Sequence, residues 1–241
     1  LVEKPMVTST PEAERLADIA RESGKVLDIA FQAPHAPQAR AAHGAIETGR
    51  IGEVIFVRGT LAQPWLTLLA QLPQKRWRLK KASAGGGQLY DSGSHLLNAM
   101  LWITDLRPRR VFAEIDFRDE EVDVNSALTI RFENGAVGAV SVRGAASRDG
   151  LHSELQITGT KGELVLPNGS HGRGELLFYP AEGEEENLPL GDGSNPQTEF
   201  IRAIRGEVAP PCPAEYGVRL ARLMDAVYLS ASETRAVEIG T

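Results

Sequence analysis

The spacing of hydrophobic and polar residues divides the chain into a short α/β opening and a long strand-rich remainder. A helix is predicted from Thr10, as N-cap, to Gly24, because Pro11 occupies its first turn and apolar residues recur at helical spacing. The mostly apolar run at residues 26–31 is typical of a buried parallel strand. Strand–helix–strand order then predicts that residues 1–2 end another parallel strand.

The next part of the chain alternates predicted helices with less regular segments. A helix is predicted over residues 37–48 and a strand over residues 51–61. Residues 62–87 contain two prolines and three glycines, and this composition predicts an irregular segment. Asp91 is expected to open another helix, whose buried stripe is Leu97, Met100, Leu101 and Thr104.

Beyond Pro108 the pattern changes to the alternation typical of strands. Strands are predicted over residues 110–117, 126–132, 137–143, 151–158, 162–166 and 176–179. Asn134 and Gly135 supply the positive-φ residues of a hairpin turn. An acidic exposed loop over residues 183–194 and helices over residues 198–205 and 215–232 complete the chain. This order predicts an α+β fold, with a large, mostly antiparallel sheet of about six strands that carries helices on one face.

Composition narrows the classes of function. The net charge of −6, without a clustered basic stripe, argues against a nucleic-acid surface. No apolar run approaches the roughly 18 residues that cross a bilayer, and no signal-peptide pattern is present, so no membrane association and a cytoplasmic location are expected. The single cysteine, Cys212, excludes an internal disulfide and a cysteine-based zinc site. The five histidines show no metal-ligand spacing, and no metal is expected.

Three short motifs, in order and spacing, resemble the Gfo/Idh/MocA oxidoreductases, which include glucose–fructose oxidoreductase and inositol dehydrogenases. The first is Glu3-Lys4-Pro5, and the second is GRIGEV at residues 49–54. The third, GGGQLYDSGSH at residues 85–95, follows Trp77 and Arg78. The resemblance runs through nearly the whole chain.

This resemblance implies that the chain contains parts of two domains and that the protein uses a nicotinamide cofactor. Residues 1–33 would be the C-terminal remnant of a Rossmann dinucleotide-binding domain, and residues 34–241 a substrate-binding and dimerisation domain. The Gly-rich dinucleotide loop has no counterpart here, because the glycines at 135–138 lie in a predicted hairpin and those at 169–174 precede no helix. On the family's layout, most of the Rossmann domain would precede Leu1. The implied cofactor is NAD or NADP, and the implied partner is a second copy, in a dimer or dimer of dimers through the open sheet face.

The resemblance also assigns roles to individual residues. Lys4 would polarise the reacting oxygen, and His95 would exchange the hydroxyl proton. Asp91, four residues before His95 and therefore on the same helix face, would hydrogen-bond the substrate hydroxyls or orient His95, although an aspartate there is also a common helix cap. The residues expected at the cofactor are Glu3, Lys4, Pro5, Trp77 and Arg78.

Two departures from the family pattern leave the substrate open. Asn98 stands where the family often has aspartate, and Gln32-Ala33-Pro34-His35 replaces a segment that commonly carries arginine. The expected activity is hydride transfer between a nicotinamide cofactor and a sugar, polyol or related hydroxy compound. The alternative is a non-catalytic ligand-binding or assembly module, either a fragment or a redox-inactive branch of the family.

Overall fold

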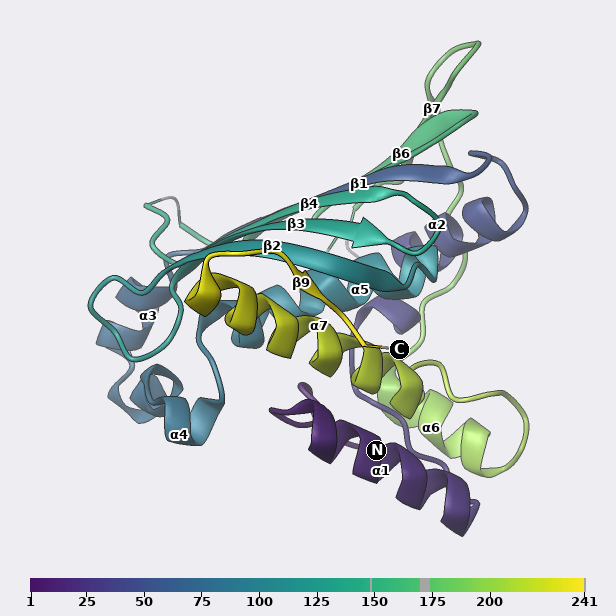
Figure 1. Ribbon diagram of the computed structural model, residues 1–241. Coiled ribbons are helices and arrows are strands. Elements are labelled where there is room, and N and C mark those ends of the chain that lie inside the picture. The colour runs from purple at the N-terminus through teal and green to yellow at the C-terminus, as the bar shows by residue number, and fades with distance from the viewer. Residues whose placement is uncertain (148, 170–173, 241) are drawn as a thin grey trace.

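A single nine-stranded sheet forms the centre of the computed structural model, which describes residues 1–147, 149–169 and 174–240 (Figure 1). The order of strands is β8-β7-β6-β5-β1-β4-β3-β2-β9, and only β1 and β4 pair in parallel. Their bounds are β1 Val54–Ala62, β2 Pro108–Asp116, β3 Asn125–Phe132, β4 Val137–Arg143, β5 His152–Gly159, β6 Gly162–Pro167, β7 Leu177–Pro180, β8 Glu186–Asn187 and β9 Val237–Glu238. The predicted α+β class and mostly antiparallel sheet are confirmed.

Both predicted hairpins are present in the sheet, as the antiparallel pairs β3–β4 and β5–β6. Gly135 adopts a φ of 91° between β3 and β4, as predicted. The prediction of a positive φ at Asn134 was wrong; its side chain instead accepts a hydrogen bond from the Ala136 amide at 3.0 Å. A shorter turn, Thr160-Lys161, joins β5 and β6, with Gly159 opposite Gly162. The sequence analysis missed β8 and β9, because two-residue strands carry no alternation to detect.

Helices cover one face of the sheet, and the other face is bare (Figure 1). Their bounds are α1 Thr10–Ser23, α2 Pro37–Glu47, α5 Ser94–Thr104, α6 Pro196–Ile204 and α7 Ala214–Glu233. The predicted stripe of α5 is buried throughout, at Leu97, Met100, Leu101 and Thr104. On the bare face, Phe56 and Phe112 remain 38% and 36% exposed.

The α/β opening differs in detail from the prediction. Ser9 occupies the N-cap position of α1 instead of Thr10, whereas Gly24 ends the helix with a φ of 65° as predicted. Residues 26–31 form isolated bridges and not a continuous strand. Ile29 pairs in parallel with Val2, as expected, but Asp28 pairs on its other side with Pro213 in the loop before α7.

Residues 62–87 were wrongly predicted to be irregular. They form α3 (Trp65–Gln71), the 3-10 helix η2 (Pro73–Leu79) and α4 (Lys81–Ala84). Trp65, Leu69 and Leu79 pack with Val122 and Val124 in a small hydrophobic cluster separate from the main core. This long-range packing stabilises short helices that the prolines alone argue against.

The sequence analysis rejected two glycine-rich segments as dinucleotide-binding loops, and the structure describes only the first of them in full. The glycines at 135 and 138 lie in the β3–β4 hairpin and at the start of β4, as predicted. Residues 170–173, within the second segment, lie outside the described residues, and so does His171.

Candidate active site

Lys4 and Asp91 meet although 87 positions separate them in the sequence. The Lys4 Nζ donates to the Asp91 carbonyl oxygen at 2.6 Å and lies 3.4 Å from Asp91 Oδ1. Lys4 directly follows the Val2–Ile29 bridge, and Asp91 lies in the π-helical turn η3 (Leu89–Gly93) that leads into α5. The two side chains are 18% and 23% exposed, so this ion pair is shielded from water without being sealed from it.

Two further donors hold the Asp91 carboxylate. Trp65 donates its indole N–H to Oδ2 at 2.9 Å, and the Arg78 Nε lies 3.3 Å from the same oxygen. Three donor side chains from three different segments therefore fix one carboxylate. The sequence analysis did not identify Trp65, although a buried tryptophan generally needs an acceptor for its N–H and so could have indicated this contact.

Asp91 does not act as the cap of a helix. Its own amide donates to the Gly87 carbonyl at 2.9 Å, inside η3, and its carboxylate points to Lys4, Trp65 and Arg78. The free amides of this turn donate their hydrogen bonds to Asp123, which the sequence analysis did not single out. The helical segment begins at Leu89, before Asp91, and the prediction of a helix opening at Asp91 was wrong by half a turn.

The buried carboxylate of Asp123 anchors the turn that carries Asp91. It accepts hydrogen bonds from the Gly87 amide and the Leu89 amide, both at 2.6 Å, and a further one from the Tyr228 hydroxyl. Burial is the largest cause that raises the pKa of Tyr228, followed by the charge of Asp123, so the phenol remains a donor. The position of Asp91 thus depends on a contact made from the opposite side of the turn.

Close packing explains all three glycines at 85–87. A Cβ on Gly85, whose φ is 74°, would lie 2.6 Å from the Thr8 side chain. A Cβ on Gly87 would lie 1.9 Å from the Asp123 carbonyl oxygen, and a Cβ on Gly86 would lie 2.2 Å from the Tyr90 ring. Since the Asp123 neighbour is backbone, it cannot move aside. These glycines allow the chain to approach its own segments closely.

His95 stands in the first turn of α5, four residues after Asp91 and on the same face. Its ring packs edge-on against Phe31, with centroids 5.8 Å apart and planes at 88°. Phe31 lies two residues beyond Ile29, the partner of Val2, and Lys4 lies two residues beyond Val2. The ends of these paired segments therefore bring Lys4 and His95 into the same region of the molecule.

The other predicted residues border this group. Trp77 is 50% exposed, and the Arg78 guanidinium lies 5.1 Å from the centre of its ring. Glu3 is exposed, and a cis peptide bond joins Lys4 to Pro5. Arg78 thus contacts both the Trp77 ring and the Asp91 carboxylate, whereas the Glu3 side chain is exposed to solvent.

A buried polar group lies one turn beyond His95. The Asn98 Nδ2 is 3.6 Å from the Cys212 Sγ, and the Cys212 amide donates to Asp28 Oδ1 at 2.8 Å. All three side chains are almost fully buried. Burial raises the pKa of Asp28 and raises the pKa of the Cys212 thiol to about 12. Cys212 is therefore part of the protein interior.

We expect native Cys212 to be unreactive toward a thiol reagent such as dithionitrobenzoate at pH 8. The reagent attacks thiolate, and a thiol that is buried and titrates at about 12 supplies almost none. The measurement is the release of thionitrobenzoate before and after unfolding in guanidinium chloride. Rapid modification of the native chain would contradict the buried placement, and complete modification after unfolding is the control.

Neither a metal centre nor a membrane span is found in the described residues. No group of three or more histidine, cysteine or acidic side chains there could hold a metal ion. No described helix is long and apolar enough to cross a membrane.

Comparison of the sequence with protein families places it beside known oxidoreductases. Residues 39–165 match the family described as GFO/IDH/MocA C-terminal domain. D-xylose 1-dehydrogenase [NADP(+)] of Haloarcula marismortui is 29% identical over 252 residues, an alignment that covers 98% of this chain and 66% of the relative. Levoglucosan dehydrogenase of Pseudarthrobacter phenanthrenivorans is 26% identical over 289 residues, covering 99% of this chain and 73% of the relative. The chain thus spans about two thirds to three quarters of the length of these relatives.

Solved structures share the fold. An inositol dehydrogenase homolog from Azotobacter vinelandii, complexed with NAD+, superposes with a TM-score of 0.86 at 20% identity, covering 98% of this chain and 71% of that one. A levoglucosan dehydrogenase in complex with NADH and levoglucosan superposes with a TM-score of 0.83 at 25% identity, covering 99% of this chain and 73% of that one.

Proposed function

The chain belongs to the Gfo/Idh/MocA family of oxidoreductases, and from this membership we propose that it forms the substrate-binding part of an NAD(P)-dependent enzyme. The enzyme would transfer a hydride between the nicotinamide cofactor and a sugar, polyol or related hydroxy compound. The observation that carries this proposal is the contact between Lys4 and Asp91, one helical turn before His95. The opening segment thereby supplies a cation, η3 a carboxylate and α5 an imidazole.

The arrangement around Lys4 fits a dinucleotide. Val2 and Ile29 pair in parallel, and Lys4 and Pro5 follow at the carboxyl end of that pair, which is the edge where open α/β sheets bind dinucleotides. The residues that would hold the cofactor are Glu3, Lys4, Pro5, Trp77 and Arg78. Of these, Trp77 offers an exposed ring and Arg78 a cation held by Asp91. A bound nicotinamide supplies the hydride acceptor or donor, as NAD or NADP.

The catalytic side chains would divide the work on the substrate hydroxyl. His95 would accept the hydroxyl proton during oxidation and return it during reduction, since an imidazole titrates near neutral pH. The Lys4 ammonium would stabilise negative charge on the reacting oxygen. The Asp91 carboxylate would keep the ammonium in place and bind a neighbouring hydroxyl, while Trp65 and Arg78 prevent its rotation.

The test is an assay of the full-length protein with NAD+ and NADP+ against a panel of aldoses, inositols and anhydro sugars. We expect substrate-dependent formation of reduced nicotinamide with at least one cofactor. Sugar binding detected by calorimetry, without turnover with any member of the panel, would contradict the proposal. That outcome would favour the alternative of a non-catalytic ligand-binding module.

We also infer how the chain is divided and assembled. Residues 1–33 would complete a dinucleotide-binding domain, and residues 34–241 would form the substrate domain. The exposed Phe56 and Phe112 on the bare sheet face support its use as the contact between two copies, in a homodimer or a dimer of dimers. A cytoplasmic location is part of the same proposal.

A further inference from the structure

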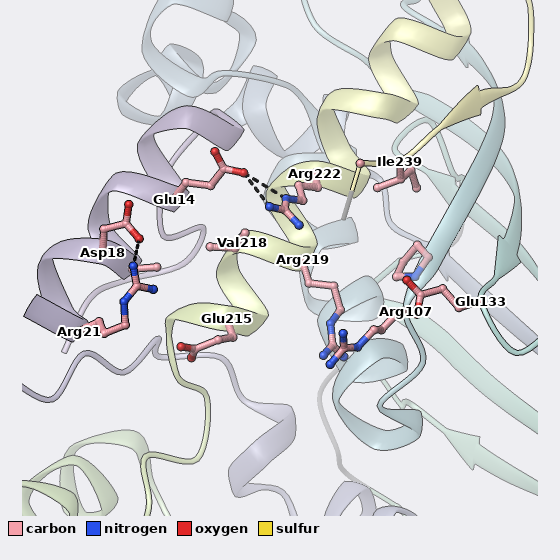
Figure 2. Close-up of a pocket in the computed structure, with 13 residues that line it drawn as sticks. Glu14, Asp18, Arg21, Arg107, Glu133, Glu215, Val218, Arg219, Arg222 and Ile239 are labelled. Atoms are coloured by element: carbon pink, nitrogen blue, oxygen red, sulfur yellow. Dashed lines mark hydrogen bonds and ion pairs between the residues drawn. The ribbon is translucent and has the colours of Figure 1, made fainter.

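A cavity lies between α1, α7 and the end of the chain, and no residue of the candidate active site lines it (Figure 2). Its volume is about 360 Å³, within the range of small-ligand pockets. Ala17, Val218, Pro108 and Ile239 supply apolar wall. The cavity can therefore enclose a small organic molecule.

Arg219 is held rigidly in one wall of this cavity. Its side chain is only 17% exposed, and its Nη1 donates to Asp105 Oδ1 at 2.8 Å. The guanidinium also lies 5.0 Å from the ring centre of Tyr216, whose hydroxyl reaches the same Asp105 oxygen at 3.4 Å. A guanidinium has five N–H donors, and Asp105 takes one. Asp105 and Tyr216 thus orient the Arg219 guanidinium before any ligand binds, and its other N–H groups can donate hydrogen bonds to a ligand.

Arg107 adds a second guanidinium at the same end of the cavity (Figure 2). In the part of the chain that the structure describes, its side chain forms no ion pair and no hydrogen bond. The other arginines of the lining differ in this respect, because Arg21 is paired with Asp18 and Arg222 with Glu14. Two guanidinium groups that face the same space repel one another unless an anion lies between them.

Acidic side chains of the lining do not fill this role. Glu215 points away from the two arginines (Figure 2). Glu133 also lines the cavity, yet no described carboxylate comes within 4.0 Å of the Arg107 guanidinium. The place between Arg107 and Arg219 therefore suits an oxyanion from outside the chain.

We propose that this cavity binds a phosphate group, with Arg107 and Arg219 as its ligands. Guanidinium groups match the geometry of phosphate oxygens and can donate two parallel hydrogen bonds. The phosphate could arrive as the free ion or as a small phosphomonoester, whose organic part would lie against Val218 and Ile239. Because α1 and α7 both contribute wall, a bound phosphate ester would strengthen the contact between them.

Isothermal titration calorimetry of the full-length protein with inorganic phosphate and with phenyl phosphate, at constant ionic strength, tests the proposal. We expect saturable binding of phosphate and tighter binding of phenyl phosphate if esters are the ligand, or equal binding if the free ion is. Arg107→Gln and Arg219→Gln should each weaken binding about tenfold or more. Arg21→Gln, in the same cavity but paired with Asp18, is the matched control and should bind as the unaltered protein does.

Three results would overturn the assignment. They are no saturable heat with either probe, unchanged affinity in Arg107→Gln, or a loss in Arg21→Gln as large as that in Arg107→Gln. Arg107 is exposed and bears no partner among the described residues, so its replacement should leave the fold intact, which thermal unfolding checks. The test thus remains decisive even if Arg219→Gln, which removes the contact with Asp105, destabilises the protein.

Discussion

Replacing Lys4 by methionine in the full-length protein is expected to lower kcat/KM for hydride transfer by about 100- to 1,000-fold, the usual cost of removing one group that stabilises developing charge on oxygen. Methionine keeps the length and much of the apolar stem of lysine but lacks the ammonium. Steady-state kinetics with the best substrate of the panel measures the effect. Most of the loss should fall on kcat, because the charge develops in the transition state.

A matched replacement separates this effect from a general loss of positive charge. Lys25 is exposed in the loop after α1, and Lys25→Met should change kcat/KM by less than about twofold. A Lys4→Met enzyme with nearly unaltered kcat/KM would remove Lys4 from the mechanism. The Lys4–Asp91 contact would then be a structural ion pair only.

The second large effect is expected on stability, from Asp123→Ala. This change leaves the buried amides of Gly87 and Leu89 and the Tyr228 hydroxyl without their acceptor. An unsatisfied buried donor costs about 1–3 kcal/mol, so we expect the free energy of unfolding to fall by about 3–5 kcal/mol. Urea unfolding, read from the denaturation midpoint at constant slope, measures the change.

Two other variants calibrate this result. Asp192→Ala, in an exposed loop, should alter the free energy of unfolding by less than about 0.5 kcal/mol. Asp123→Asn retains one acceptor oxygen and should fall between the alanine variant and the unaltered protein. If Asp123→Ala were as stable as Asp192→Ala, Asp123 would not anchor the turn that carries Asp91.

The success of the sequence analysis depended on how local each signal was. The hairpin at Asn134 and Gly135 and the end of α1 at Gly24 followed from the backbone preferences of single residues. Both are present, although Gly135 has the predicted positive φ and Asn134 does not. The helices in residues 62–87 were missed because their stability comes from Trp65 and Leu79 packing on Val122 and Val124, which lie about forty to sixty positions later. No local pattern contains that information.

The same distinction applies to the candidate site. Motif order selected Lys4 and Asp91, and the structure places them in contact. Trp65 and Asp123 were not selected, since one contacts Asp91 from a segment with no recognisable motif and the other supports the turn from behind. Sequence motifs identify side chains that point toward a ligand more readily than those that support them from behind.

The position of β1 in the middle of the sheet affects how the chain folds. Its two neighbours, β4 and β5, lie about 80 to 100 residues further along the chain, and pairing at such separations is slow because a long loop must first be closed. During synthesis, the edge of β1 that pairs with β4 remains open until residue 143 has emerged, and the edge that pairs with β5 remains open until residue 159 has emerged. A shortened chain that stops before residue 137 would keep those edges available for pairing with other chains, and such chains are prone to aggregate.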